Sequence, residues 1–208
     1  MPLDPSLQEL STGSNILANY NAMELLSGVG YATLYAGGTI DKYLLSNITF
    51  YADPSATQGL LSNTTIDADF DITIQTPVTF KGTAILNIPE SIRLGSDAGS
   101  CSFNAKIYKV VGAVETELAT NAGSTFTGTT SSTKYRIECI DLTISETVFN
   151  YGDILRLNIT GTGSTGGAPA PERNFNISHD PKNRTAGWDA TGAVPSQMAI
   201  QLPVKIDI

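Results

Sequence analysis

"QMAIQLPVKIDI", residues 197–208, alternates large apolar side chains with small or polar ones. The apolar series is Met198, Ile200, Leu202, Val204, Ile206 and Ile208. Successive side chains of a β-strand point to opposite faces of its sheet, so a period of two indicates one buried and one exposed face. The stretch therefore predicts a strand with one side packed against a core.

The same design recurs along the chain. In "DILRLNITG", residues 153–161, Leu155, Leu157 and Ile159 alternate with polar side chains. Further β-rich runs, separated by turn-forming residues, cover 31–39, 42–54, 69–75, 83–89, 102–111 and 134–145. About eight antiparallel strands with few helical stretches predict an all-β fold, an antiparallel β-sandwich of jelly-roll type.

One strand is predicted to be irregular. In "KYRIECIDLTIS", residues 134–145, the apolar positions change phase between Cys139 and Ile140. An extra residue in one strand of a pair produces such a change, so we expect a bulge or bend at this point.

The chain is expected to form one domain with an arm. Its 208 residues fall within the range of a single domain. The regular β pattern covers residues 29–208, and residues 1–28 read as an N-terminal arm with one or two helical turns around residues 22–26. Prolines and Gly13 interrupt the apolar residues of the arm, so it buries little by itself, and we expect it to mediate assembly. These apolar residues are Leu3, Leu7, Leu10, Ile16, Leu17, Leu25 and Leu26.

Composition excludes several function classes. The net charge is −8, and the 12 Lys and Arg residues are scattered, so no basic patch for nucleic acid is expected. The N-terminal residues lack a basic segment followed by an apolar one, so we do not expect export, and no 18-residue apolar run predicts a membrane span. Cys101 and Cys139 lie in β-rich runs without CxxC spacing, which favours buried free thiols over a disulfide.

An acidic run raises the question of a metal site. "DADFDITIQTPV", residues 67–78, begins like a calcium loop with Asp67, Asp69 and Asp71. Such a loop needs glycine at its sixth position and an acidic ligand at its twelfth, where this chain has Ile72 and Val78. We therefore interpret the aspartates as the exposed face of an amphipathic strand.

Other candidate sites are weak. "GTGSTGGAPAPERN", residues 161–174, is glycine-rich but leads into no helix, so a mobile loop is expected rather than a phosphate site. Glu115 and Glu117 could be paired catalytic carboxylates, but they lie in a charged hairpin whose simplest role is a soluble turn. No cofactor is predicted.

"FNISHDPKNRTAGWD", residues 175–189, contains the chain's one histidine and one tryptophan. His179 could act as a base only beside a nucleophile and an orienting acid, and no G-x-S-x-G motif is present. Asp180 before Pro181 favours a turn, Arg184 can reach back to an aspartate, and Trp188 can bury a large surface. We therefore predict a structural loop that pins strands together, and a chain that is not an enzyme.

The order of motifs adds a family resemblance. "YGDILRLNITGT" (151–162), a glycine-rich insertion, "HDPKNR" (179–184) and "LPVKIDI" (202–208) resemble the small decoration or accessory head proteins of tailed bacteriophages. "GYATLYAGGTIDKYLLSNITFYADP" (30–54) is similar to the same group. The resemblance implies a jelly-roll protein, made in the host cytoplasm, that binds the capsid surface and cements the shell. It implies the major capsid protein or another virion protein as partner and a homo-oligomer, with a trimer favoured. It brings no catalytic residue.

Two alternatives remain open. A receptor-binding or carbohydrate-binding fibre module would expose a row of aromatic residues, for which the grouped candidates are Tyr31, Tyr35, Tyr43 and Tyr51. A jelly-roll coat protein would instead form the shell by itself.

Overall fold

A computed structural model describes residues 18–19, 29–39, 42–47, 59–63, 65–93, 99–128, 134–165, 174–180 and 198–205. Every regular element within them is a strand, so the predicted all-β fold is confirmed. The strands are β1 (Ala18–Asn19), β2 (Val29–Thr39), β3 (Lys42–Ser46), β4 (Gly59–Asn63), β5 (Thr65–Thr73), β6 (Val78–Arg93), β7 (Gly99–Val111), β8 (Val114–Ala122), β9 (Phe126–Gly128), β10 (Lys134–Phe149), β11 (Ile154–Thr165), β12 (Asn174–Asp180) and β13 (Ala199–Lys205). No helix among the described residues is long and apolar enough to cross a membrane.

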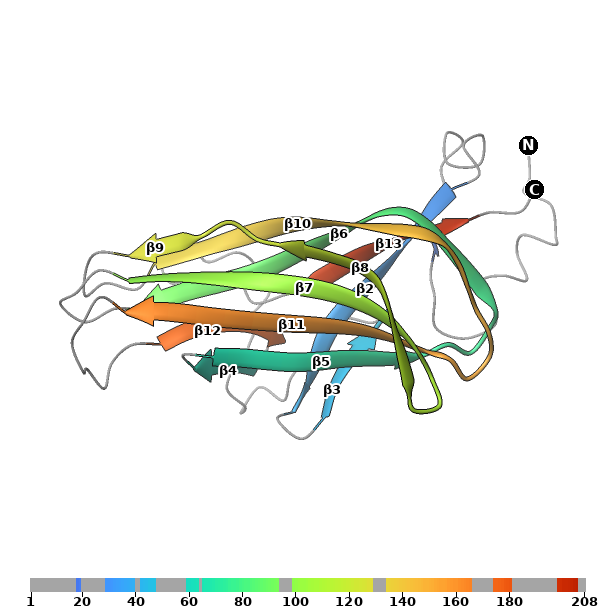
Figure 1. The fold of residues 1–208 in the computed structure, drawn as a ribbon, viewed down its shortest axis with the longest axis horizontal. Coiled ribbons are helices and arrows are strands. Elements are labelled where there is room, and N and C mark those ends of the chain that lie inside the picture. Colours follow the sequence, from blue (N-terminus) through green and yellow to red (C-terminus); the bar gives the residue numbers. More distant parts are fainter. Residues whose placement is uncertain are drawn as a thin grey trace.

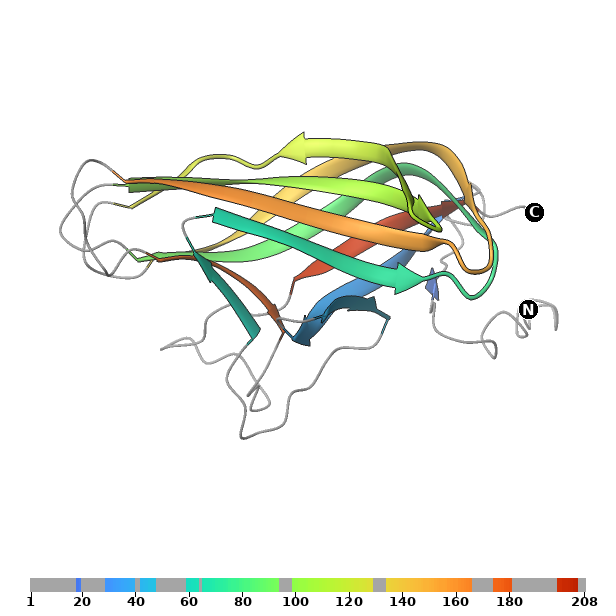
Figure 2. The same ribbon diagram turned by 60° about the horizontal axis from the view of Figure 1, so that its bottom comes forward.

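The strands form two layers that are almost closed into a barrel (Figures 1 and 2). One layer is the antiparallel series β5–β11–β7–β8, with β9 pairing one end of β7. In the other layer β10 pairs along β6, and β12 and β13 share the opposite edge of β6. β13 continues to β2 and β3, and β12 continues to β4. A single parallel pairing, Leu44 with Asp71, joins β3 to β5.

The core lies between the layers and follows the alternation of each strand. In and just before β13, the predicted buried face is confirmed through Val204: Met198, Ile200, Leu202 and Val204 are buried. On the face predicted to be exposed, Gln201 is exposed, but Pro203 is buried, so that part of the prediction is wrong. Burying each large aliphatic or aromatic side chain contributes about 1.5–3 kcal/mol. The largest fully buried side chains are Phe70, Phe80, Phe103, Phe149, Phe175, Leu34, Ile74, Leu86, Ile88, Ile92 and Ile107.

Glycines of β11 make room for two of these rings. A Cβ added at Gly161 would lie 2.4 Å from Phe103 Cδ1, and one at Gly163 would lie 1.6 Å from Phe175 Cε2. The glycine-rich stretch predicted as a loop from residue 161 therefore begins as strand, since β11 continues to Thr165. Residues 166–173 lie outside the described residues.

The predicted bulge is misplaced. β10 pairs with β6 without interruption at Cys139 and Ile140, and the register shifts instead between Ile144 and Thr147. The phase of the strand does not change at Cys139. The apolar pattern changes because Arg136 and Glu138 occupy inward-facing positions, which leaves apolar side chains outward.

The predicted pinning loop begins later than expected. Residues 174–180 form β12, which pairs with β6 and β4, so His179 and Asp180 belong to a strand. The alternation of Phe175 and Ile177, both buried, was the signal for it. The side chains of His179 and Asp180 and all of Pro181, Arg184 and Trp188 lie outside the described residues, so the pinning role stays a prediction.

Most of the arm also lies outside the described residues, including its seven leucine and isoleucine residues. Ala18 and Asn19 form β1 and pair with Ala32 and Tyr31 of β2. The helical turns and the assembly role of the arm stay predictions. Both cysteines are free, so the disulfide alternative is excluded. Cys101 is buried as predicted, but Cys139 is exposed, so that part of the prediction is wrong.

Replacing Ile200 or Leu202 with Asp would place an unpaired charge in the core. We expect the free energy of unfolding to fall by about 3 kcal/mol or more, enough to abolish soluble expression. Gln201→Asp, on the exposed face of the same strand, should leave yield and melting temperature nearly unchanged. Unchanged thermal melting of either core variant would contradict the assigned face.

Candidate functional site

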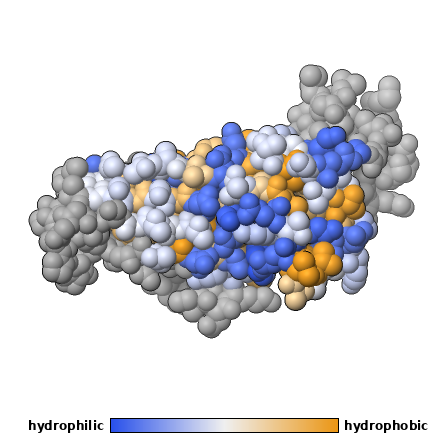
Figure 3. Space-filling model, in the orientation of Figure 1, coloured by the Kyte–Doolittle hydropathy of each residue, from blue (hydrophilic) through white to orange (hydrophobic). Residues whose placement is uncertain are grey.

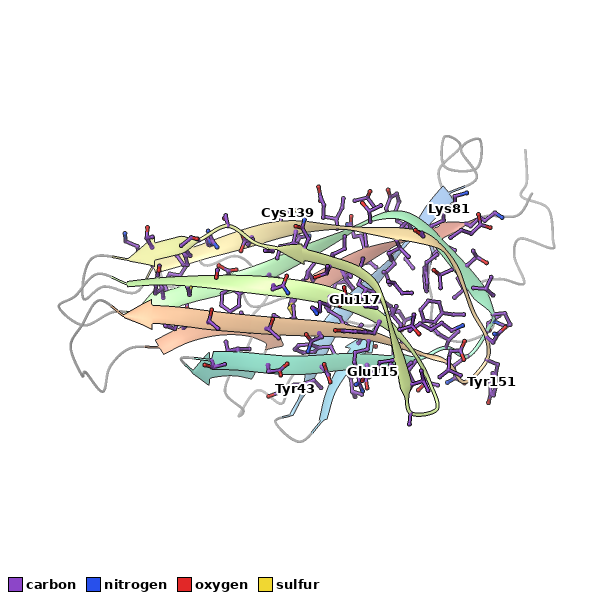
Figure 4. The ribbon with its side chains drawn as sticks, viewed as in Figure 1. Tyr43, Lys81, Glu115, Glu117, Cys139 and Tyr151 are labelled. Atoms are coloured by element: carbon purple, nitrogen blue, oxygen red, sulfur yellow. The ribbon has the colours of Figure 1, made fainter. Side chains whose placement is uncertain are left out.

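A band of charged and polar side chains covers the outside of the β5–β11–β7–β8 layer (Figures 3 and 4). These side chains occupy the outward positions of strands whose alternate residues fill the core. We call this band the outer charged face, and its members are Asp67, Asp69, Asp71, Lys106, Tyr108, Glu115, Glu117, Arg156 and Asn158.

Arg156 lies at the centre of the outer charged face. Its Nε donates to Asp71 Oδ1 at 2.8 Å and its Nη2 to Asp71 Oδ2 at 2.7 Å, a bidentate pair across β11 and β5. Nη1 also contacts Asp69 at 3.2 Å and donates to Glu115 of β8. The hydrogen bonds to Asp71 are the main cause that raises the pKa of Arg156. This guanidinium therefore joins three strands of one layer.

The neighbouring carboxylates are paired as well. Asn158 Nδ2 lies 2.9 Å from Asp67 Oδ1 and 2.7 Å from Asp69 Oδ1. Lys106 Nζ donates to Glu117 Oε2 at 2.9 Å. An exposed ion pair such as Lys106–Glu117 adds little to stability, because water screens it. The prediction that Asp67, Asp69 and Asp71 lie on the outward face of a strand is confirmed. Glu115 and Glu117 lie on β8, and each pairs with a cationic side chain.

The outer charged face does not form an evident metal centre. Nowhere in the described ranges do three or more His, Cys, Asp or Glu side chains gather so that they could hold a metal ion. The arrangement links neighbouring strands of the layer through ion pairs and hydrogen bonds.

A second, buried cluster lies where the two layers meet. We call it the seam cluster; it consists of Glu90 of β6, Arg136 and Glu138 of β10, and Ser124, which precedes β9. Arg136 Nε donates to Glu90 Oε2 at 2.7 Å, and Nη2 donates to Glu138 Oε2 at 2.9 Å. The guanidinium lies over the Phe126 ring, 4.6 Å from its centroid.

Ser124 connects this cluster to the opposite layer. Arg136 donates to the Ser124 hydroxyl at 3.0 Å and to its carbonyl at 2.7 Å. The Ser124 hydroxyl and amide in turn donate to Glu138 Oε1. Nearby, Asn121 Nδ2 of β8 donates to the Asp141 carbonyl of β10 at 2.9 Å. Side chains therefore close the edge between β8 and β10.

Burial perturbs the acids of the seam cluster. Burial, followed by a hydrogen bond with Glu138, raises the pKa of Glu90 to about 8. Burial also acts to raise the pKa of Glu138, but hydrogen bonds with Glu90 and Ser124 outweigh it, and its pKa lies below its ordinary value. Burial raises the pKa of Cys101 on β7 to about 12, so its thiol is protonated near neutral pH.

The inward direction of these charges turns apolar side chains outward. Tyr135 is 49% exposed and Ile137 is 51% exposed, and we call these two side chains the apolar strip of β10. By the alternation of β10, the exposed Cys139 follows them on the same face. Sequence reasoning missed both the strip and the cluster. The signal was a pair of charges at alternate positions inside an otherwise apolar β run.

The aromatic row proposed for a fibre module is not assembled. Tyr31 is 36% exposed on β2, and Tyr35 lies on the same side of that strand. Tyr43 packs against Phe70 instead, with ring centroids 5.1 Å apart, and is partly buried against the core. Tyr51 lies outside the described residues.

Comparison with known proteins gives similarity in fold only. No family model matches the chain, and no curated protein matches it. A CocE/NonD family hydrolase from Staphylococcus aureus is 15% identical, with a TM-score of 0.51 over 85% of this chain and 37% of the hydrolase. An aminopeptidase from a marine sediment Thaumarchaeota archaeon is 13% identical, with a TM-score of 0.52 over 84% of this chain and 36% of the enzyme. A chain of infectious bursal disease virus matches at a TM-score of 0.29, with 14% identity over 86% of this chain and 48% of the viral one, which is too low to support an inference.

These matches correct one expectation. The prediction that the chain is not an enzyme is contradicted, because hydrolases are among the solved structures that share its fold, at TM-scores of 0.51 and 0.52. The chain spans little more than a third of the length of those enzymes.

Removing the cation of the seam cluster should destabilise the protein strongly. Arg136→Met leaves Glu138 buried without its cation and breaks the bonds to Ser124, so we expect a loss of about 3 kcal/mol or more in the free energy of unfolding. Lys81→Met breaks an exposed, solvent-screened pair with Glu146 and should change the free energy of unfolding far less. Chemical denaturation of both variants measures the difference, and equal losses would contradict the structural role of the cluster.

Proposed function

We propose that this chain is a structural subunit of a virion, which binds the capsid shell through the apolar strip of β10. The observation that carries the proposal is the outward direction of Tyr135 and Ile137, each about half exposed on a strand at the edge of its layer. Covering these side chains with a partner would remove apolar surface from water, which favours association.

The chemistry of the strip suits a protein partner. Aromatic residues such as Tyr135 are enriched in the cores of interfaces, where they bury much area at little cost in side-chain entropy. The charged side chains of Arg136 and Glu138 on this strand point inward. The outward face of β10 near residues 135–139 therefore keeps its apolar character.

The order of sequence motifs supports the virion as the setting. The stretches 151–162, 179–184 and 202–208 resemble those of phage decoration proteins. On this proposal the partner is the major capsid protein or another virion protein, the oligomer is a trimer, and the protein lies on the capsid surface. The leucine-rich arm supplies a second contact.

Shell binding tests the role of the strip directly. Ile137→Lys should weaken co-sedimentation with undecorated particles at least tenfold, because it places a charge in the interface. Ser145→Lys makes the same change in charge at an exposed position on the same strand and should bind like the unaltered protein. Both variants should keep the melting temperature, since neither position is buried.

Three other outcomes contradict the proposal. Equal binding by the two variants removes the strip from the interface. Self-assembly of the purified chain into closed shells makes it a coat protein. Binding to cells or oligosaccharides without binding to particles makes it a fibre module.

The hydrolase matches favour a second candidate function, the β-sandwich part of a larger hydrolase. Its support is the similarity in fold to a CocE/NonD family hydrolase and an aminopeptidase at TM-scores of 0.51 and 0.52. Because the isolated chain would then lack the rest of the hydrolase, the test is an assay on ester and aminoacyl-peptide substrates of the protein isolated from its natural source. Turnover that follows the protein through gel filtration supports this candidate, and no turnover beside tight shell binding contradicts it.

A further inference from the structure

One buried acid in the seam cluster has an oxygen without a donor. The Glu90 side chain is fully buried, and Arg136 donates to its Oε2, but Oε1 has no hydrogen-bond partner. An ionised carboxylate accepts hydrogen bonds at both oxygens, and an unsatisfied buried one is costly. A protonated carboxyl is itself a donor, so a proton on Glu90 allows it to donate to the neighbouring Glu138 carboxylate.

The charges around Glu90 fit a single proton. Among the described residues, Arg136 and Glu138 face it from β10, and the Cys101 thiol lies close enough on β7 to interact with it. One guanidinium balances one carboxylate. If Glu90 and Glu138 were both ionised, the cluster would carry a net negative charge away from water, which is unfavourable.

We propose that the Glu90–Glu138 pair holds one proton that keeps the edge between β10 and Ser124 closed, and that loss of this proton under alkaline conditions opens the edge. The proposal concerns the fold itself and does not depend on the shell-binding role.

The geometry links the acid pair to the opposite layer. Glu138 accepts from both the amide and the hydroxyl of Ser124, and Arg136 donates to the hydroxyl and carbonyl of the same residue. A Cβ added at Gly123 would lie 2.3 Å from Glu138 Oε2, so the backbone passes directly against this carboxylate. If both acids were ionised, repulsion between the Glu90 and Glu138 carboxylates would displace Glu138 and would therefore also disturb residues 123 and 124.

The direction of the pH dependence follows from the shift of Glu90. Burial raises its pKa to about 8, above its value in an unfolded chain. The native state therefore holds a proton that the unfolded state has released, and the stability from this proton is full at pH values below the ordinary pKa. It is lost as the pH rises from about 4.5 to about 8. The lowered pKa of Glu138 acts only at acid pH, where its protonation removes stability.

The unaltered protein provides the first test. Carboxyl carbon resonances of Glu90 should titrate well above those of exposed glutamates, and the protection of the Ser124 amide against hydrogen exchange should fall over the same pH range. Titration of Glu90 near its ordinary value, or Ser124 protection that does not change with pH, would overturn the proposal.

Glu90→Gln tests the mechanism, because its amide is neutral at every pH and can donate to Glu138. The variant should keep Ser124 protection through alkaline pH and should melt at a higher temperature than the unaltered protein there, with no advantage at acid pH. Glu146→Gln, which alters an exposed acid paired with Lys81 and Lys205, is the matched control and should keep the pH dependence. A Glu90→Gln protein that loses protection as the unaltered one does contradicts the proposal.

Discussion

Arg136 joins three segments where the two layers meet, and much of the molecule depends on this contact. It holds Glu90 of β6, Glu138 of its own strand and the backbone of Ser124 beside β9. Since β8 and β10 are linked by side chains at this edge, the guanidinium and the Asn121 bridge take the place of backbone pairing. Placing Arg136 and Glu138 inward has a second effect, because the alternation of β10 then directs Tyr135 and Ile137 to solvent. Closure of this edge and the outward direction of the apolar strip thus have one cause.

The sequence predicted the strands that follow the simple rule of apolar side chains inward and polar ones outward. β13, β11 and the Asp67–Asp71 face of β5 obey this rule, and the structure confirms them. β10 breaks the rule, because the ion-paired Arg136 points inward while the neighbouring Ile137 is exposed. The resulting change of phase in the apolar positions suggested a bulge at Cys139, where the pairing is regular. The glycine-rich stretch from residue 161 was predicted to be a loop. Gly161 and Gly163 instead lie in β11, where the absence of a side chain makes room for the rings of Phe103 and Phe175. The seam cluster could not be predicted, because it combines residues about 46 positions apart in sequence.

The comparisons give structural similarity to hydrolases, whereas the surface of the chain offers an exposed apolar strip and no evident catalytic group among the described residues. A fold shared with hydrolases at 13–15% identity describes the architecture of the chain, and the architecture alone hosts many functions. The surface features are specific to these residues: an outer charged face in which Arg156 orders three strands, and an apolar strip on β10. The first ties strands of one layer together, and the second leaves apolar side chains exposed to solvent.

On our proposal, a proton shared by Glu90 and Glu138 acts together with Arg136 to close the edge of the sandwich. Neutron diffraction from crystals of the unaltered protein near neutral pH tests it most directly, because deuterons are visible. The account predicts one deuteron on Glu90 directed at Glu138, and Arg136 bonded to both acids and to Ser124. Two ionised carboxylates without a deuteron between them, or a Ser124 backbone separated from Arg136, would contradict it.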